Sequence, residues 1–187
     1  FVTGRGLARI ILGSYLGISP DAVAFSYGEK GKPCLAGEES GIQFNISHSG
    51  GAVVLGFTSG PAVGVDVERI WTASDDQIAR RFFSSGEYEK LMTLAGPDRI
   101  RAFFVCWTRK EAFIKACGLG LSCPLDSFEV ALLPGELPQV RMIRGEPDSH
   151  GWSMLDIEVD SAYVSACAVR NEGMTMRHIH REISCMV

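Results

Sequence analysis

The sequence predicts an α+β fold, and three observations carry this prediction. Apolar residues recur at helical spacing near the start of the chain, and short strand-like runs follow as far as Glu68. Stretches with helix caps or helical spacing then occupy residues 74–118. Strand-like runs return beyond Pro124, so the helices and strands are grouped rather than strictly alternating.

The first part of the chain is expected to hold one helix and several short strands. The helix covers residues 6–16, where positions 7, 10, 11 and 15 are apolar, and Gly17-Ile-Ser-Pro20 ends it. Strands are expected at residues 23–27, 44–47, 52–57 and 63–68, with glycine-containing loops at 28–33 and 48–51. A boundary near residues 60–64 divides an N-terminal part, residues 1–63, from a C-terminal part, residues 64–187.

The second part is expected to begin with helices and to end with strands. Ser74-Asp-Asp-Gln77 fits a capping box, and Ser84 with Glu87 offers a second one. The longest helix starts at Asp98, carries an apolar stripe at positions 100, 103, 104, 107 and 114, and stops at Gly118. Strands are expected at residues 127–132, 139–143, 152–159 and 163–169.

Composition and charge narrow the class of protein. The 187 residues are 46% hydrophobic and 21% charged with a net charge of −4, so we expect a globular chain with no disulfides, no basic face for nucleic acid and a cytoplasmic location. The six cysteines lack metal-site spacing and are expected to be reduced thiols. No apolar run is long enough for a membrane span. The chain begins at Phe1, and we expect it to be truncated or processed there.

Two acids in the strand at residues 63–68 share one face, because side chains two apart on a strand point the same way. These are Asp66 and Glu68, while Val65 and Val67 point to the opposite face. Two like charges on one face repel unless a cation lies between them, and Mg²⁺ prefers carboxylate oxygens. The alternative is an ordinary solvated strand face.

A second acid–base group lies on the longest helix. Glu111 and Lys115 are one turn apart on the same side, and Trp107 precedes Glu111 by another turn. A charged pair that continues an apolar stripe is expected to face a cleft, although an exposed helix-stabilising pair has the same spacing. A local excess of basic residues between Arg99 and Lys115 favours an anionic ligand.

A turn histidine adds a possible phosphate contact. His48 stands between Ser47 and Ser49 at the end of an expected strand, directly before Gly50-Gly51. Imidazole and hydroxyl groups presented by such a turn can hold a phosphate. The alternative is a histidine that makes only local hydrogen bonds.

These residues occur in motifs that resemble one family when they are taken in order. The motifs are Gly31-Lys-Pro33, Phe44-Asn-Ile-Ser-His-Ser49, Gly64-Val-Asp-Val-Glu68, Arg81-Phe-Phe83 with Glu87, and Trp107-Thr-Arg-Lys-Glu-Ala112 with Lys115 and Gly118. The chain resembles a 4′-phosphopantetheinyl transferase of the Sfp (surfactin-synthetase-activating) type from about residue 4 to about residue 169. Family members carry further residues, some of them basic, before the position that matches Phe1.

The resemblance implies two similar α/β subdomains related by pseudo-twofold symmetry, with coenzyme A in the cleft between them. It implies transfer of phosphopantetheine from coenzyme A to a serine of an apo acyl or peptidyl carrier protein, with release of adenosine 3′,5′-bisphosphate. Mg²⁺ is the expected metal, with Mn²⁺ as a substitute. The implied metal ligands are Asp66, Glu68 and Glu111, and the implied coenzyme A contacts are Lys32, Ser47, His48, Lys110 and Lys115.

The expected mechanism needs no enzyme nucleophile. Glu111, or a metal-bound water that it orients, is the expected base for the carrier serine, and Lys115 is expected to stabilise the leaving phosphate. Residues 70–94 form a candidate carrier-docking surface that includes Trp71, Arg80 and Arg81. Phe82 and Phe83 belong either to that surface or to the core of an amphipathic helix.

Two other functions remain open from the sequence. A non-catalytic module that binds coenzyme A or a nucleotide would keep Lys32, Ser47 and His48 without needing three acids. A structural protein with solvated acids would need none of these groups. The sequence leaves the carrier protein and its pathway open, and a monomer is expected because the chain completes its own cleft.

Overall fold

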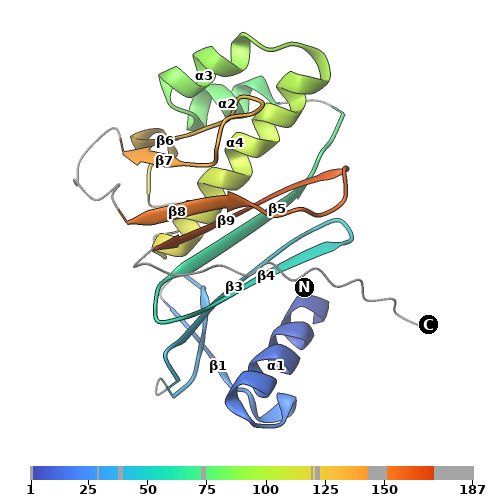
Figure 1. The fold of residues 1–187 in the computed structure, drawn as a ribbon, viewed down its shortest axis with the longest axis vertical. Coiled ribbons are helices and arrows are strands. Elements are labelled where there is room, and N and C mark those ends of the chain that lie inside the picture. Colours follow the sequence, from blue (N-terminus) through green and yellow to red (C-terminus); the bar gives the residue numbers. More distant parts are fainter. Residues whose placement is uncertain are drawn as a thin grey trace.

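The computed structural model describes residues 2–28, 30–37, 40–72, 75–118, 120, 123–142 and 151–170, and it combines helices with small antiparallel sheets (Figure 1). The α+β prediction is therefore confirmed. The elements in chain order are α1 (Val2–Leu16), β1 (Phe25–Tyr27), β2 (Pro33–Leu35), β3 (Ile42–Ser49), β4 (Ala52–Ser59), β5 (Val63–Arg69), α2 (Asp76–Phe82), α3 (Ser85–Met92), α4 (Gly96–Cys117), β6 (Phe128–Val130), β7 (Val140–Met142), β8 (Trp152–Asp156) and β9 (Tyr163–Arg170).

The N-terminal part packs α1 against an antiparallel hairpin. Strands β3 and β4 pair from Ile42 opposite Ser59 to Ser49 opposite Ala52, and β1 pairs with β2. Ala8 and Leu12 of α1 are fully buried, and they pack in one cluster with Phe44 of β3. Burial of the apolar face of α1 therefore holds this helix to the hairpin.

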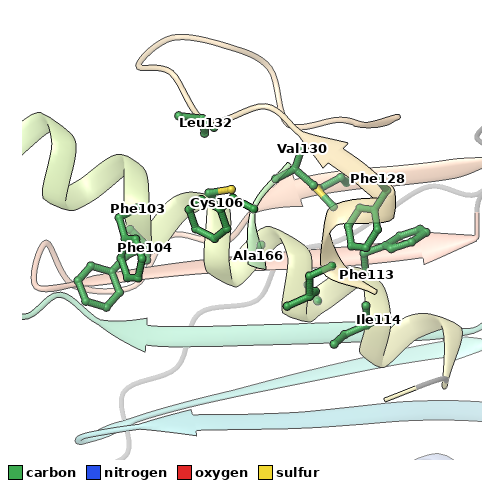
Figure 2. Packing of buried hydrophobic residues seen from close by; sticks show 14 of the residues in the cluster. Phe103, Phe104, Cys106, Phe113, Ile114, Phe128, Val130, Leu132 and Ala166 are labelled. Carbon is green, nitrogen blue, oxygen red and sulfur yellow. The ribbon is translucent and has the colours of Figure 1, made fainter. Parts of the chain in front are cut away.

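The C-terminal part is built on a three-stranded antiparallel sheet in the order β5-β9-β8. Helix α4 lies across this sheet (Figure 1), and its buried face supplies eight of the 19 buried residues of the larger core. Figure 2 shows Cys106 and Phe113 of α4 close to Phe128 and Val130 of β6. The Phe113 and Phe128 rings lie 4.7 Å apart between centroids, so α4 is fixed on both of its buried sides.

Gly64 explains how closely α4 approaches β5. A Cβ atom at this position would lie 2.1 Å from the carbonyl oxygen of Ala112 and 2.3 Å from the backbone nitrogen of Ala116. Only glycine permits such a contact between the strand and the helix backbone. As a consequence, the acids that follow Gly64 on the same face of β5 lie beside the last turns of α4.

The two parts meet where β3 and β5 lie side by side without a shared backbone ladder (Figure 1). Side chains of β3 replace that ladder. The oxygen atoms of Asn45, Ser47 and Ser49 accept hydrogen bonds from the backbone N–H groups of Val65, Val67 and Arg69 at 2.8, 3.3 and 3.1 Å. Alternate residues of one strand thus satisfy alternate donors of the other, and β5 is not left as an open edge.

Most of the expected elements are present, with shifted ends. Helix α4 begins at Gly96 rather than Asp98, and Gly118 ends it with a left-handed backbone at φ 71°. The capping box of Ser84 and Glu87 is confirmed. Asp75 caps α2, while Ser74 of the other expected box lies outside the described residues. No helix among the described ranges is long and apolar enough to cross a membrane.

Candidate functional site

A polar cluster occupies the junction of β3, β5 and α4. Its centre is the carboxylate of Asp66, whose Oδ1 accepts hydrogen bonds from Lys115 Nζ at 2.6 Å and from Ser47 Oγ at 2.9 Å. Lys115 Nζ also lies 3.2 Å from Ser47 Oγ. The structure therefore joins three residues that the sequence predicted for the site, one from each element.

Asp66 is held in an environment that leaves half of its carboxylate unused. The residue is 3% exposed, and its Oδ2 is buried without a hydrogen-bond partner among the described residues. Burial raises the pKa of Asp66, and Lys115 and Ser47 oppose this rise. A buried carboxylate oxygen without a partner is costly, so this atom is suited to a cationic ligand.

Glu68 and Glu111 complete an acidic group around Asp66. Ser49 Oγ donates to Glu68 Oε2 at 2.9 Å. Burial raises the pKa of Glu68 and of Glu111, and the charge of Asp66 raises both further. Glu68 also raises the pKa of Glu111, whereas Lys115 lowers it. The three carboxylates therefore share one electrostatic environment.

The donor set of this group fits a hard divalent cation, which prefers carboxylate oxygens. Asp66 Oδ2 and the second carboxylate oxygen of Glu68 are the atoms that Lys115 and the serines do not occupy. Within the part of the chain that the structure describes, the acids are not gathered at coordination distances. Lys115 supplies the positive charge next to Asp66 instead.

Lys32 lies at the boundary of the two parts rather than among the acids. Its Nζ donates to the carbonyl oxygens of Lys115 at 2.7 Å and Val63 at 3.1 Å. Burial lowers the pKa of Lys32. These bonds attach the loop between β1 and β2 to the end of α4 and the start of β5.

Lys110 lies in the core, away from the acidic group. Its side chain is fully buried, and its Nζ contacts Glu87 Oε2 at 2.7 Å and the carbonyl oxygens of Leu125 and Phe128 at 2.6 and 2.7 Å. The ammonium group also lies 4.3 Å from the centroid of the Phe128 ring. All three of its protons have acceptors, so the structure does not support the predicted contact of Lys110 with a pyrophosphate.

Ser47 and His48 lie on opposite faces of β3, because neighbouring side chains of a strand alternate. Ser47 faces β5 and is 6% exposed, whereas His48 is exposed. The two residues therefore cannot contact a ligand from the same side of the strand unless the ligand lies beyond its end, near the Gly50-Gly51 turn.

The candidate docking segment divides between core and surface. Phe83 is buried, and Phe82 packs edge-on against Trp107 at 5.9 Å between ring centroids. Trp71 is 61% exposed, with the Arg69 guanidinium 5.6 Å from its ring centroid. Phe83 thus belongs to the core, and Trp71 remains on the surface just beyond the acids of β5.

Sequence reasoning offered Ser49 only as a possible phosphate contact and gave Asn45 no role. Both lie on the face of β3 that binds the backbone of β5, together with Ser47. The available signal was the alternation of polar residues at positions 43, 45, 47 and 49 with Ile42, Phe44 and Ile46. That alternation marks a strand whose polar face is buried against hydrogen-bonding groups.

Sequence comparison shows which protein family the chain belongs to. The profile of the 4′-phosphopantetheinyl transferase superfamily matches residues 62–168, and the profile of a 4′-phosphopantetheinyl transferase N-terminal region matches residues 1–59. The chain belongs to the 4′-phosphopantetheinyl transferase superfamily. It is therefore an enzyme of the transferase class, and the resemblance found from its motifs is confirmed.

Individual phosphopantetheinyl transferases match most of the chain. HetI of Nostoc sp. is 37% identical over 183 residues, which are 96% of this chain and 74% of that protein. Sfp of Bacillus subtilis is 37% identical over 167 residues, or 88% of this chain and 71% of that protein. The crystal structure of Thermotoga maritima holo-[acyl-carrier-protein] synthase covers 59% of this chain and 62% of its own at 20% identity, with a TM-score of 0.47.

Proposed function

We propose that this transferase moves the 4′-phosphopantetheine group of coenzyme A to a serine hydroxyl of an apo acyl or peptidyl carrier protein. Adenosine 3′,5′-bisphosphate is the leaving product. The observation that carries the proposal is the group formed by Asp66, Glu68, Glu111 and Lys115 in a chain of this superfamily. Three acids with one partly exposed lysine suit the transfer of a charged phosphoryl group.

Asp66, Glu68 and Glu111 are the proposed ligands of Mg²⁺, with Mn²⁺ as a substitute. The Oδ2 of Asp66, which has no hydrogen-bond partner in the described ranges, and the mutual effect of the three charges on their pKa values support this assignment. The metal, when bound, supplies positive charge that offsets the developing negative charge of the pyrophosphate. All three side chains reach the site from rigid elements, β5 and α4.

Glu111 is the proposed base that receives the proton of the attacking serine, directly or through a water that it orients. Burial and the charges of Asp66 and Glu68 raise the pKa of Glu111, which increases its affinity for a proton. A carboxylate in this environment is a stronger base than one in open solvent. Its position on α4 faces the same space as the acids of β5.

Lys115 is proposed to change partners during the reaction. Its ammonium group is paired with Asp66, and its side chain is 30% exposed. A long, partly exposed side chain can turn toward a phosphate while its stem stays on α4. Lys115 would then stabilise the charge of the leaving group, and Ser47 would keep its hydrogen bond to Asp66.

The remaining coenzyme A contacts are assigned by proximity to this group. Lys32 and Ser47 line the junction of the two parts, and exposed His48 stands next to Ser47 at the end of β3. We propose that His48 contacts the 3′-phosphate at that end and that Lys32 lies near the adenosine, whereas Ser47, whose single proton goes to Asp66, supports the site through that carboxylate. Lys110 is left out because its ammonium group is fully engaged in the core.

The reaction is tested by intact-mass spectrometry of an apo carrier protein incubated with this chain, coenzyme A and Mg²⁺. We expect the carrier to gain the mass of one phosphopantetheinyl group, and we expect EDTA to abolish the gain. A chain that binds coenzyme A but modifies none of a panel of fatty-acid, polyketide and peptide carriers would favour a binding module instead. Size-exclusion chromatography of the same sample tests the proposed monomer.

Glu111→Gln tests the proposed base in the same assay. The substitution keeps the size of the side chain and removes its charge, so we expect a folded protein whose transfer rate falls by about three orders of magnitude. Glu158→Gln, at an exposed position between β8 and β9 and outside the candidate docking segment, is the matched control and should transfer at the wild-type rate. Transfer by Glu111→Gln at the rate of this control would remove Glu111 from the mechanism.

A further inference from the structure

Two serines of β3 make the same pair of hydrogen bonds with successive acids of β5. Ser47 Oγ accepts from Val67 N at 3.3 Å and donates to Asp66 Oδ1 at 2.9 Å. Ser49 Oγ accepts from Arg69 N at 3.1 Å and donates to Glu68 Oε2 at 2.9 Å. Each hydroxyl thus contacts one acid and the backbone of the residue after it.

This arrangement fixes the direction of each hydroxyl proton. A serine hydroxyl has a single proton, and an oxygen that already accepts from a backbone N–H must direct this proton elsewhere. In both cases the carboxylate is the acceptor. The hydroxyl therefore holds one carboxylate oxygen of its acid and leaves the other oxygen without a bond from that serine.

The end of the β3–β4 hairpin is anchored, so Ser49 cannot easily move away from Glu68. Gly51 N donates to the Tyr163 hydroxyl at 3.1 Å, and Tyr163 pairs with Arg69 across β5 and β9. Gly50 has φ 55°, and a Cβ at that position would lie 2.8 Å from the Tyr163 hydroxyl oxygen. The turn therefore fits tightly against β9 only with glycine at this position.

We infer that Ser49 is a positioning residue for Glu68, which sets the affinity of the site for its divalent metal; this inference rests on the proposed function. A side chain that orients a metal-ligating carboxylate acts on binding through the ligand rather than by touching the metal. The N-terminal part of the chain thus helps to shape a site whose acids all belong to the C-terminal part.

The test measures metal affinity directly, by electron paramagnetic resonance titration of Mn²⁺ with the full chain saturated with coenzyme A. We expect Ser49→Ala to weaken Mn²⁺ binding about 10-fold or more, because loss of such a partner typically costs 10- to 100-fold in metal affinity. The Mg²⁺ concentration for half-maximal transfer should rise by a similar factor. The KM for the carrier protein should stay unchanged.

Three further variants separate positioning from a general loss of structure. Ser49→Thr keeps the hydroxyl and should restore Mn²⁺ affinity, whereas Ser49→Cys keeps the size but donates weakly and should give an intermediate affinity. Thr58→Val removes a hydroxyl that bonds the Pro61 carbonyl in the same hairpin, away from the acids, and should bind Mn²⁺ like the wild type.

The outcomes distinguish this inference from the proposed function. Wild-type chain that transfers with Mg²⁺, together with Ser49→Ala and Ser49→Cys variants of unchanged Mn²⁺ affinity, would overturn the role of Ser49 alone. Equal weakening in Thr58→Val, or no recovery in Ser49→Thr, would overturn it as well. Wild-type chain that neither binds Mn²⁺ nor transfers would overturn both.

Discussion

Two lysines on one helix, Lys110 and Lys115, show how differently the same motif can use the same charge. Lys110 pairs with Glu87 where both side chains are fully buried, and Lys115 pairs with Asp66 where the lysine is 30% exposed. The nitrogen–oxygen distances are nearly equal, 2.7 and 2.6 Å. Distance alone therefore does not distinguish a structural ion pair from one that belongs to a functional site.

The difference lies in how completely the acids are satisfied. Glu87 accepts from the backbone N–H of Ser84 at 2.8 Å and of Val130 at 2.7 Å in addition to Lys110, so both of its oxygens are used. Asp66 keeps one buried oxygen without a partner among the described residues. A complete network fixes a structure, whereas an incomplete one leaves a site for a ligand, at a cost in stability to the fold.

The largest effect is expected where the network is complete. Lys110→Met leaves Glu87 with its charge buried and uncompensated, so we expect the free energy of unfolding to fall by about 3–5 kcal/mol. Urea denaturation followed by circular dichroism measures this loss, and Glu87→Gln should lose stability through the same pair. A loss below about 1 kcal/mol would mean that the buried pair does not hold α3 to α4.

Lys115→Met should show the opposite pattern, with a smaller loss of stability and a large loss of transfer activity. Only the lysine of this pair is partly exposed, and the buried Asp66 can take up a proton when its partner is lost, so we expect a smaller stability loss than for Lys110→Met, about 1–3 kcal/mol. The transfer rate should fall by about 100-fold or more, because a charge aimed at the leaving phosphate is lost. Lys115→Arg keeps the charge and is the matched variant for steady-state kinetics. If Lys115→Met were as unstable as Lys110→Met, the two pairs would not differ in kind.

The contrast between the two lysines was in part readable from the sequence. An α-helix turns by about 100° per residue, so Lys110 and Lys115 lie about 140° apart around the axis, whereas Glu111 and Lys115 lie about 40° apart. The shared site of Glu111 and Lys115 followed from that spacing. The same spacing places Lys110 on another side of the helix from Lys115, so the shared site that the resemblance implies for both lysines does not agree with helical geometry.

Helical spacing does not predict which residue pairs with Lys110. Glu87 is recognisable as the last residue of a capping box, but its bonds to Val130 N and Lys110 depend on how α3 and β6 pack against α4. The carbonyl acceptors of Leu125 and Phe128 lie just before β6 and at its first residue, and backbone acceptors carry no side-chain signal. Tertiary contacts of this kind leave no local pattern in a single sequence.

The fold as a whole shows the same division between local features, which the sequence predicts, and tertiary contacts, which it does not. Capping residues, glycines and apolar periods predicted most of the helices and strands, because these are local preferences. The contact between β3 and β5 was not predicted, since it uses side chains of one strand and the backbone of another rather than a ladder. The joining of the two parts therefore had to come from the structure.

A third prediction concerns the packing of α4 against β5 rather than the charges on α4. Gly64→Ala would place a methyl group within 2.3 Å of the backbone of α4, which must shift away from β5. Overpacking of this kind typically costs about 1–3 kcal/mol, which thermal denaturation can detect. The Lys115–Asp66 pair spans the displaced contact, so transfer should fall as well. Gly60→Ala, where a Cβ meets no atom within 4 Å, tests whether the effect needs that contact, although its φ of 101° adds backbone strain of its own.

The smallest expected effect concerns two cysteines of α4, one near the Lys110–Glu87 pair and one near the Lys115–Asp66 pair. Cys106 is fully buried one turn before Lys110, and burial together with Glu87 raises its pKa well above the usual range. Cys117 is partly buried two residues after Lys115, and burial raises its pKa from 9.0 to about 11.

At mildly alkaline pH, iodoacetamide should therefore alkylate Cys117 slowly, about 10- to 100-fold more slowly than a short cysteine peptide, because little thiolate is present. Cys106 should stay unmodified until the protein unfolds, because alkylation there requires the Lys110–Glu87 network to open. Peptide mass spectrometry over time measures both rates, and the same reaction in urea, where both thiols are exposed, provides the control. Equal rates in the native protein would mean that the middle and the C-terminal end of α4 open together, and the distinction between a closed network and an available site would then not hold in solution.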